Sequence, residues 1–178
     1  MRAKLENKIY SDTEYLNIVS DIINNENVLK MKGYRQHFDT TCYDHCLEAS
    51  YYSYKVCKFL HLDYTASARA AMVHDMFLYD WRKPNPYGGL HAFTHGKLAY
   101  ENASKYFEFN KKEKDIIIKH MWPICIGFPK YIESYILTIV DKHCTMLEAI
   151  DDLSHDFSIK KLFKPAYVFL AFILFKRH

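Results

Sequence analysis

Residues 70–77 read Ala-Ala-Met-Val-His-Asp-Met-Phe, so a histidine and an aspartate stand side by side in an otherwise apolar run. A charged group on an apolar helix is costly to bury unless it is paired or bound to a metal ion. The dipeptide recurs as His155-Asp156, but residues 153–158 form a polar stretch that suits a helix cap or a solvated turn. We therefore interpret His74 and Asp75 as functional residues.

Further metal-binding candidates lie elsewhere in the chain. Asp141 follows an apolar run, residues 135–140, and needs a partner there for the same reason. His45 lies between Asp44 and Cys46 in another predicted helix. Imidazole nitrogens and carboxylate oxygens together suit zinc, iron or manganese rather than calcium. The candidate ligands of an open, catalytic metal site are His45, His74, Asp75, His95, His120 and Asp141.

Length and composition indicate one folded globular domain. The chain has 178 residues, of which 49% are hydrophobic and 25% charged, so it can bury a sizeable core. The 5 glycines and 5 prolines are too few for the many turns of a sandwich or barrel. A net charge of +3 is compatible with a small anionic ligand and far from the strongly basic surface of a protein that binds nucleic-acid polymers.

Cysteine usage favours a reducing compartment. The 5 cysteines are an odd number, they form no C-x-x-C motif, and the polar start of the chain has no secretory signal. We expect a cytoplasmic protein with free thiols. Cys42 and Cys46 lie one helical turn apart near His45, and we interpret them as small buried hydrophobic residues rather than ligands or redox groups.

Helical periodicity and capping signals recur along the chain, and no alternating strand pattern of useful length is present. The sequence therefore predicts an all-α, single-domain helical bundle. Helices are expected from a capping box at Ser11 and Glu14, over 41–60, from about Thr65, from a cap at Thr94 to about 106, from a capping box at Asn110 and Glu113 to Pro123, over 130–150, and over 158–176 around Pro165, with a loop at 83–89. These helices are expected to form an N-terminal extension (1–36), a metal-binding core (37–150) and a closing segment (151–178).

The closing segment contains the run AYVFLAFILF, residues 166–175. Ten residues are too few to span a membrane, which takes about 20 in a helix. We interpret the run as a buried closing element. An oligomer contact is the first alternative, and membrane attachment helped by Lys176 and Arg177 is the second.

The order of the ligands carries a family resemblance. His45, then the pair His74-Asp75, then Asp141 on three predicted helices resembles the metal-site pattern of the HD-domain metal-dependent phosphohydrolase superfamily, over roughly residues 37–148. The chain looks like the small, single-domain bacterial members. The resemblance implies that these four residues hold a first metal ion.

Two further histidines bear on the number of ions. In dinuclear members, two histidines fall between the HD pair and the last aspartate, and His95 and His120 resemble them. The resemblance then implies that Asp75 bridges to a second ion held by these two. The alternative is a mononuclear site in which His95 and His120 orient other groups or face the substrate. His91 could replace or support His95.

The resemblance implies divalent transition-metal ions, with iron or manganese preferred and zinc, nickel, cobalt or magnesium as alternatives. Two such ions activate a water for in-line attack on phosphorus. Lys142, next to Asp141, is the first candidate to bind the phosphate, and Arg82 is the second. Further candidates are Arg69, Lys97 and Lys119, while Glu48 and Asp80 are candidates for orienting the imidazoles.

The implied function is hydrolysis of a small, nucleotide-like phosphate ester or anhydride. Two alternatives stay open. A mixed-valent di-iron oxygenase of the same fold uses a similar ligand order and would require dioxygen and ferrous iron. A binding or sensing module could keep the metal for structure alone, but a complete and open ligand set favours an enzyme.

Overall fold

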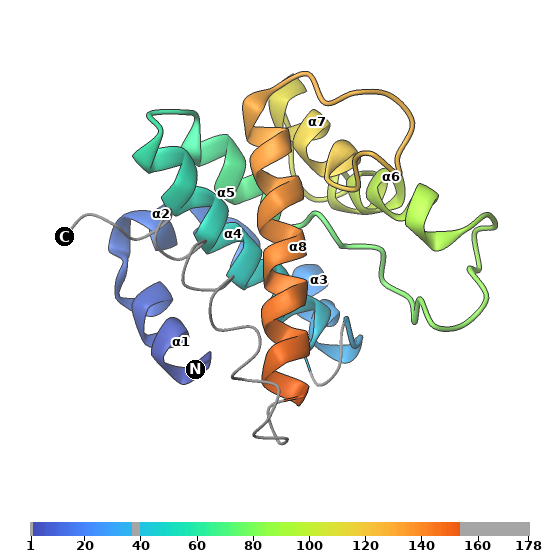
Figure 1. The fold of residues 1–178 in the computed structure, drawn as a ribbon, viewed down its shortest axis with the longest axis horizontal. Coiled ribbons are helices and arrows are strands. Elements are labelled where there is room, and N and C mark those ends of the chain that lie inside the picture. Colours follow the sequence, from blue (N-terminus) through green and yellow to red (C-terminus); the bar gives the residue numbers. More distant parts are fainter. Residues whose placement is uncertain (1, 37–39, 154–178) are drawn as a thin grey trace.

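The computed structural model describes residues 2–36 and 40–153, which form a bundle of helices without strands, as the sequence predicted (Figure 1). An isolated β-bridge joins Arg35 to Thr41. The elements are α1 (Arg2–Ser11), α2 (Thr13–Ile23), α3 (Glu26–Leu29), η1 (Lys30–Gly33), α4 (Cys42–Phe59), α5 (Tyr64–Met72), α6 (His91–Ala103), α7 (Lys111–Lys119) and α8 (Ile132–Leu153).

Helix α4 is the centre of the bundle. It packs most extensively on α5 and α8, and α7 in turn packs on α5, α6 and α8. The long helix α8 crosses the molecule beside α4 and α5 (Figure 1). Buried side chains from Ile9 in α1 to Cys144 in α8 belong to one hydrophobic cluster, so the N-terminal helices share the core of the rest of the bundle.

Local capping explains where several helices begin. The hydroxyl of Thr41 accepts from the backbone N–H of Asp44 and starts α4. Asn110 and Glu113 form the predicted capping box at the start of α7. Gly88 and Gly89 have positive φ values of 80° and 74° in the predicted loop before α6.

Two predicted caps are wrong. Ser11 ends α1, and the side chain of Asp12 caps α2 by accepting from the Tyr15 N–H at 3.2 Å. Thr94 lies inside α6, where its hydroxyl donates to the carbonyl of Leu90, the residue that precedes the helix. The Ser11 hydroxyl donates to the Lys8 carbonyl, so in both cases a polar side chain near a helix end satisfies a carbonyl instead of an orphan N–H. Helices α1 and α3 were not predicted.

The position of the HD pair also differs from the expectation of a continuous helix. Helix α5 ends at Met72, and His74 and Asp75 lie in the turn that follows. The His74 ring bonds the Ala71 carbonyl at 2.7 Å, a group that a continuing helix would have paired with a backbone N–H. Leaving the helix frees the two side chains from its fixed angular spacing.

Cys42 and Cys46 are buried, as expected, and all 5 cysteines are free thiols. His37, His155-Asp156 and the apolar run 166–175 lie outside the described residues. Within the described part of the chain, none of the helices combines the length and apolar character needed to cross a membrane.

Candidate metal centre

The structure brings all six predicted ligands together. They come from α4, the turn after α5, α6, the residue that follows α7, and α8. They form two groups that share Asp75, and within each group one ligand atom per residue lies within 4.8 Å of the others. The inner group is His45, His74, Asp75 and Asp141, and the outer group is Asp75, His95 and His120.

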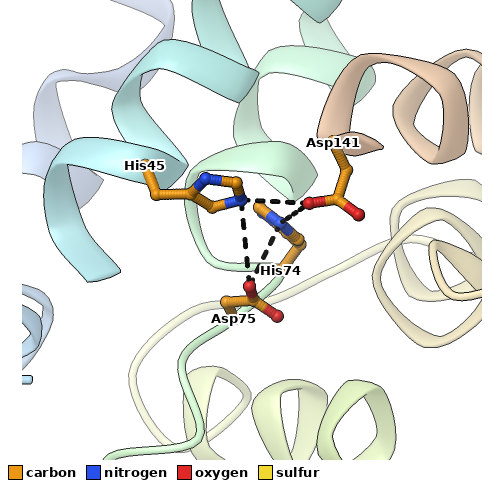
Figure 2. A group of neighbouring side chains, drawn as sticks. All are labelled: His45, His74, Asp75 and Asp141. Carbon is orange, nitrogen blue, oxygen red and sulfur yellow. Dashed lines mark hydrogen bonds and ion pairs between the residues drawn. The ribbon is translucent and has the colours of Figure 1, made fainter. Parts of the chain in front are cut away.

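The four side chains of the inner group are buried and lie close to one another (Figure 2). The Nε2 atom of His45 lies 3.0 Å from Asp141 Oδ1 and 4.0 Å from Asp75 Oδ2. The Nε2 atom of His74 lies 3.6 Å from Asp141 Oδ1 and 3.5 Å from Asp75 Oδ2. Both rings therefore direct Nε2 toward the same two carboxylates.

The outer group faces the other oxygen of Asp75. His95 Nε2 and His120 Nε2 lie 3.3 Å and 3.4 Å from Asp75 Oδ1. The two carboxylate oxygens of Asp75 thus point at different groups, which is the geometry of a bridging ligand. Gly96 allows the close approach of α6 and α7, because a Cβ there would meet the Ile118 carbonyl oxygen at 3.0 Å.

Hydrogen bonds at Nδ1 fix how the four rings point. Each Nδ1 has an oxygen partner: His45 with Glu148 Oε1 at 2.8 Å, His74 with the Ala71 carbonyl at 2.7 Å, His95 with the His91 carbonyl at 2.8 Å, and His120 with the Ile117 carbonyl at 2.7 Å. Carbonyl and carboxylate oxygens accept, so each Nδ1 donates, and a ring in its neutral form then has its lone pair on Nε2, toward the cluster. Metal-binding histidines commonly have this arrangement.

Buried atoms without a hydrogen-bond partner indicate whether these residues could bind a cation. His74 Nε2 and Asp75 Oδ1 are buried and have no hydrogen-bond partner among the described residues. Buried polar atoms without a partner are rare in folded proteins and call for one. Lone pairs and carboxylate oxygens converge here, so each group could hold a metal ion.

The electrostatics of the cluster favour charged carboxylates. Burial acts to raise the pKa of Asp75, but the imidazoles of His74, His120 and His95 outweigh it and hold that pKa well below its usual range. Burial lowers the pKa of His120, which keeps its ring neutral. At His45, burial acts to lower the pKa, but the carboxylates of Asp141 and Glu148 raise it well above the usual value. A bound cation would displace that proton.

A cavity of about 290 Å³ opens onto the centre. Its lining includes Asp75, His95, His120 and Asp141 but neither His45 nor His74. The other lining residues are Gln36, Trp81, His91, Ala92, Met121, Lys142 and Thr145. All three residues of the outer group therefore line the cavity, whereas in the inner group only the two aspartates line it and His45 and His74 lie behind them.

The predicted phosphate-binding cations fall in different places. Lys142 lines the cavity, and its Nζ donates to the Thr138 carbonyl at 3.3 Å. Arg82 does not line it and pairs with Asp80, with Nε to Oδ1 at 2.8 Å. The three further candidates also have partners away from the lining: Arg69 pairs with Asp21, Lys97 with Glu101, and Lys119 with the Ile126 carbonyl.

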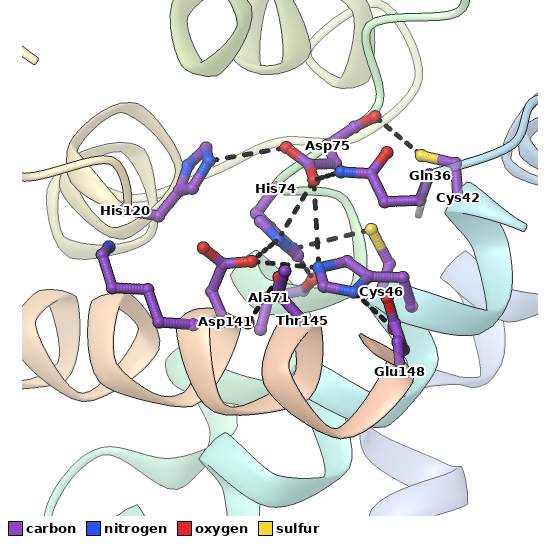
Figure 3. Close-up of polar contacts among 12 residues, drawn as sticks. Gln36, Cys42, Cys46, Ala71, His74, Asp75, His120, Asp141, Thr145 and Glu148 are labelled. Atoms are coloured by element: carbon purple, nitrogen blue, oxygen red, sulfur yellow. Dashed lines mark hydrogen bonds and ion pairs between the residues drawn. The ribbon is translucent and has the colours of Figure 1, made fainter. Parts of the chain in front are cut away.

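Two residues that contact the ligands were missed. Glu148, labelled in Figure 3, accepts from His45 Nδ1, rather than the predicted Glu48 or Asp80. It follows Asp141 by about two turns of α8, so a buried acid on that face was a usable signal. The side-chain amide of Gln36 donates to Asp75 Oδ2, and we find no signal for it in the sequence.

His91 supports the outer group rather than replacing a ligand. Its carbonyl accepts from His95 Nδ1, and its ring stacks on the His95 ring with centroids 4.4 Å apart. The His91 ring is held in turn by the Tyr79 hydroxyl at 2.7 Å.

Comparisons with protein-family models, with curated proteins and with solved structures gave no match for this chain. Its chemistry is therefore inferred from the geometry of the buried His/Asp cluster, which could hold metal.

Proposed function

We propose that the chain is an HD-type, metal-dependent phosphohydrolase that binds two divalent ions and hydrolyses a small, nucleotide-like phosphate ester or anhydride. The observation that carries this proposal is the orientation of the Asp75 carboxylate. One of its oxygens lies toward His45 and His74, and the other lies toward His95 and His120. Two ions held this way would activate a water and stabilise negative charge on the phosphoryl oxygens.

The cavity supports a catalytic rather than a structural role for the metal. Structural sites are closed by protein ligands, whereas catalytic sites keep an accessible position. Here Asp75, His95 and His120 form part of the cavity wall. A volume of about 290 Å³ suits a small molecule and is too small for a folded partner.

The cavity wall also offers groups for the rest of the substrate. Lys142 is the cation at the rim and would donate to a phosphate oxygen. Trp81 and Met121 add apolar surface on which a flat ring could pack. These features support a nucleotide-like substrate. The mixed histidine and carboxylate ligands are consistent with iron or manganese.

The decisive experiment combines metal analysis with a substrate screen. Protein purified without chelators is analysed for metals, reloaded with manganese or ferrous iron, and assayed for phosphate release from nucleoside mono-, di- and triphosphates and from phosphodiesters. We expect about two ions per chain and turnover that is lost with Asp75→Asn.

The same screen, run with and without dioxygen, separates hydrolysis from oxygenase chemistry. A hydrolase should have the same rate under both conditions. Two bound ions with no phosphate released from any substrate, together with dioxygen consumption by the ferrous protein, would refute the proposal in favour of an oxygenase.

A further inference from the structure

The two ligand groups differ in their share of negative charge. The inner group contains two aspartates, Asp75 and Asp141, while the outer group contains one carboxylate, which it shares. Attraction between a divalent cation and a carboxylate is strong in a buried site because the surroundings screen it poorly. An ion in the inner group would therefore be held by more charge.

The hydrogen bonds behind the ligands increase this difference. Among the four rings, His74, His95 and His120 bond backbone carbonyls through Nδ1, whereas His45 bonds the carboxylate of Glu148. Glu148 is only 8% exposed, and its second oxygen, Oε2, has no hydrogen-bond partner among the described residues. A buried carboxylate with this little support is costly unless positive charge lies nearby.

Access to the two groups differs in the same sense. His45 and His74 are fully buried and do not line the cavity, while His95 and His120 do. An ion in the outer group would be held by three residues of the cavity wall. An ion in the inner group would face the cavity only at Asp75 and Asp141, with His45 and His74 behind it.

We propose that the two positions bind metal in sequence, the inner one first and more tightly, and that Glu148 is a positioning residue that strengthens the inner position through His45. This inference rests on the metal-binding part of the proposed function and not on the reaction. Its consequence is a tightly held inner ion and an exchangeable outer ion next to the cavity.

Repulsion between two bound cations would by itself make the second ion bind more weakly than the first. The test therefore uses variants in which one of the two metal positions is disabled. His95→Ala disables the outer group, and His74→Ala disables the inner one. Each is made with and without Glu148→Gln, which keeps an oxygen acceptor for His45 but removes the charge. Metal-free protein is titrated with Mn²⁺ by calorimetry, and Mn²⁺ electron paramagnetic resonance counts the bound ions.

We expect Glu148→Gln to weaken Mn²⁺ binding about 10- to 100-fold in the His95→Ala background, as removal of a hydrogen-bond partner behind a metal ligand typically does. In the His74→Ala background, the change should stay within about threefold. The first dissociation constant of the unmodified protein should match that of His95→Ala. A matched control, Glu101→Gln, removes an exposed carboxylate that pairs with Lys97 on α6 and should leave both constants unchanged.

Equal weakening in both backgrounds, no weakening in either, or a first constant that matches His74→Ala would overturn the inference. If Glu148→Gln does not fold, Glu148→Asp decides, because shortening the side chain should still weaken the inner position alone. Unequal binding without any phosphate release would refute the proposed hydrolase and leave this inference standing. Phosphate release together with equal metal affinities of the two positions would refute this inference and leave the proposed hydrolase standing.

Discussion

The Nε2 atoms of His95 and His120 lie 2.8 Å apart, although each ring bonds a backbone carbonyl through Nδ1. In their neutral forms the two rings would direct lone pairs at each other, which is unfavourable unless a proton or a cation lies between them. The nearby oxygen of Asp75 adds negative charge to the same point. The outer group is thus arranged for a positive charge.

Metal removal should destabilise the protein. A ligand that binds only the folded state adds about 2.7 kcal/mol when its free concentration is 100 times its dissociation constant. We expect the unfolding temperature to fall by several degrees in chelator and to recover when metal is restored, measured by scanning calorimetry. An unfolding temperature that does not respond to chelator would contradict metal binding to the folded chain.

Asp75 should be indispensable for both ions because it belongs to both groups. Asp75→Asn keeps the shape of the side chain but removes its charge, and we expect it to lose most bound metal and all phosphate release. Asp75→Ala should behave like Asp75→Asn, whereas His74→Ala should lose the inner ion and phosphate release but keep the outer position. Elemental analysis together with the substrate screen provides the measurement, and full metal content with full turnover in Asp75→Ala would refute the metal centre.

His95 and His120 should control the metal count rather than the fold. His95→Ala and His120→Ala should each reduce the stoichiometry from about two ions per chain to about one, while circular dichroism remains that of a helical protein. If the unmodified protein binds a single ion even in excess metal, the second position is wrong and the mononuclear alternative stands.

Lys142 should act on the substrate and not on the metal. A charge-assisted contact to phosphate contributes roughly 1.5–3 kcal/mol, so Lys142→Ala should lower kcat/KM about tenfold or more at unchanged metal content. Arg82→Ala is the control, because Arg82 pairs with Asp80 and does not line the cavity. If Arg82→Ala cripples turnover and Lys142→Ala stays within about twofold, the phosphate is bound from the loop instead.

The ion pair of Arg69 and Asp21 gives a pH dependence of stability away from the metal centre. Hydrogen bonds from the Arg69 guanidinium hold the pKa of Asp21 below its usual value, with Nη1 to Oδ1 at 2.7 Å. A depressed pKa stabilises the fold above the unfolded pKa of about 3.9, and this contribution is lost as the pH falls through the folded pKa. Because Asp21 is half exposed, the effect should be below about 1 kcal/mol.

Urea unfolding of the unmodified protein and of Asp21→Asn measures this contribution. The two should differ at pH 7 and converge as the pH falls through the lowered pKa that Asp21 has in the folded protein, since both then lack the charge. A difference that persists unchanged at low pH would show that the contact does not act through the carboxylate charge.

The sequence by itself was sufficient for the helical class and for the residues that form the buried His/Asp cluster. The start of α4 at Thr41 and the capping box at Asn110 and Glu113 depend on residues within one turn, so local pattern predicts them. His74-Asp75 and Asp141 were recognisable because a charge in an apolar run needs a partner wherever the run packs. The same local reasoning misplaced the caps at Ser11 and Thr94, where the side-chain hydroxyl donates to a backbone carbonyl instead of accepting from a backbone N–H.

Only the tertiary structure decided which groups meet. Glu148 reaches His45 across 103 residues of sequence because α4 and α8 pack together, and Gln36 reaches Asp75 from a segment with no helical pattern. The choice of Lys142 over Arg82 at the cavity likewise depends on which side of the bundle each segment occupies. Capping and periodicity act over a few residues. The membership of Asp75 in both groups is instead set by how α4, α6, α7 and α8 pack around the turn that follows α5.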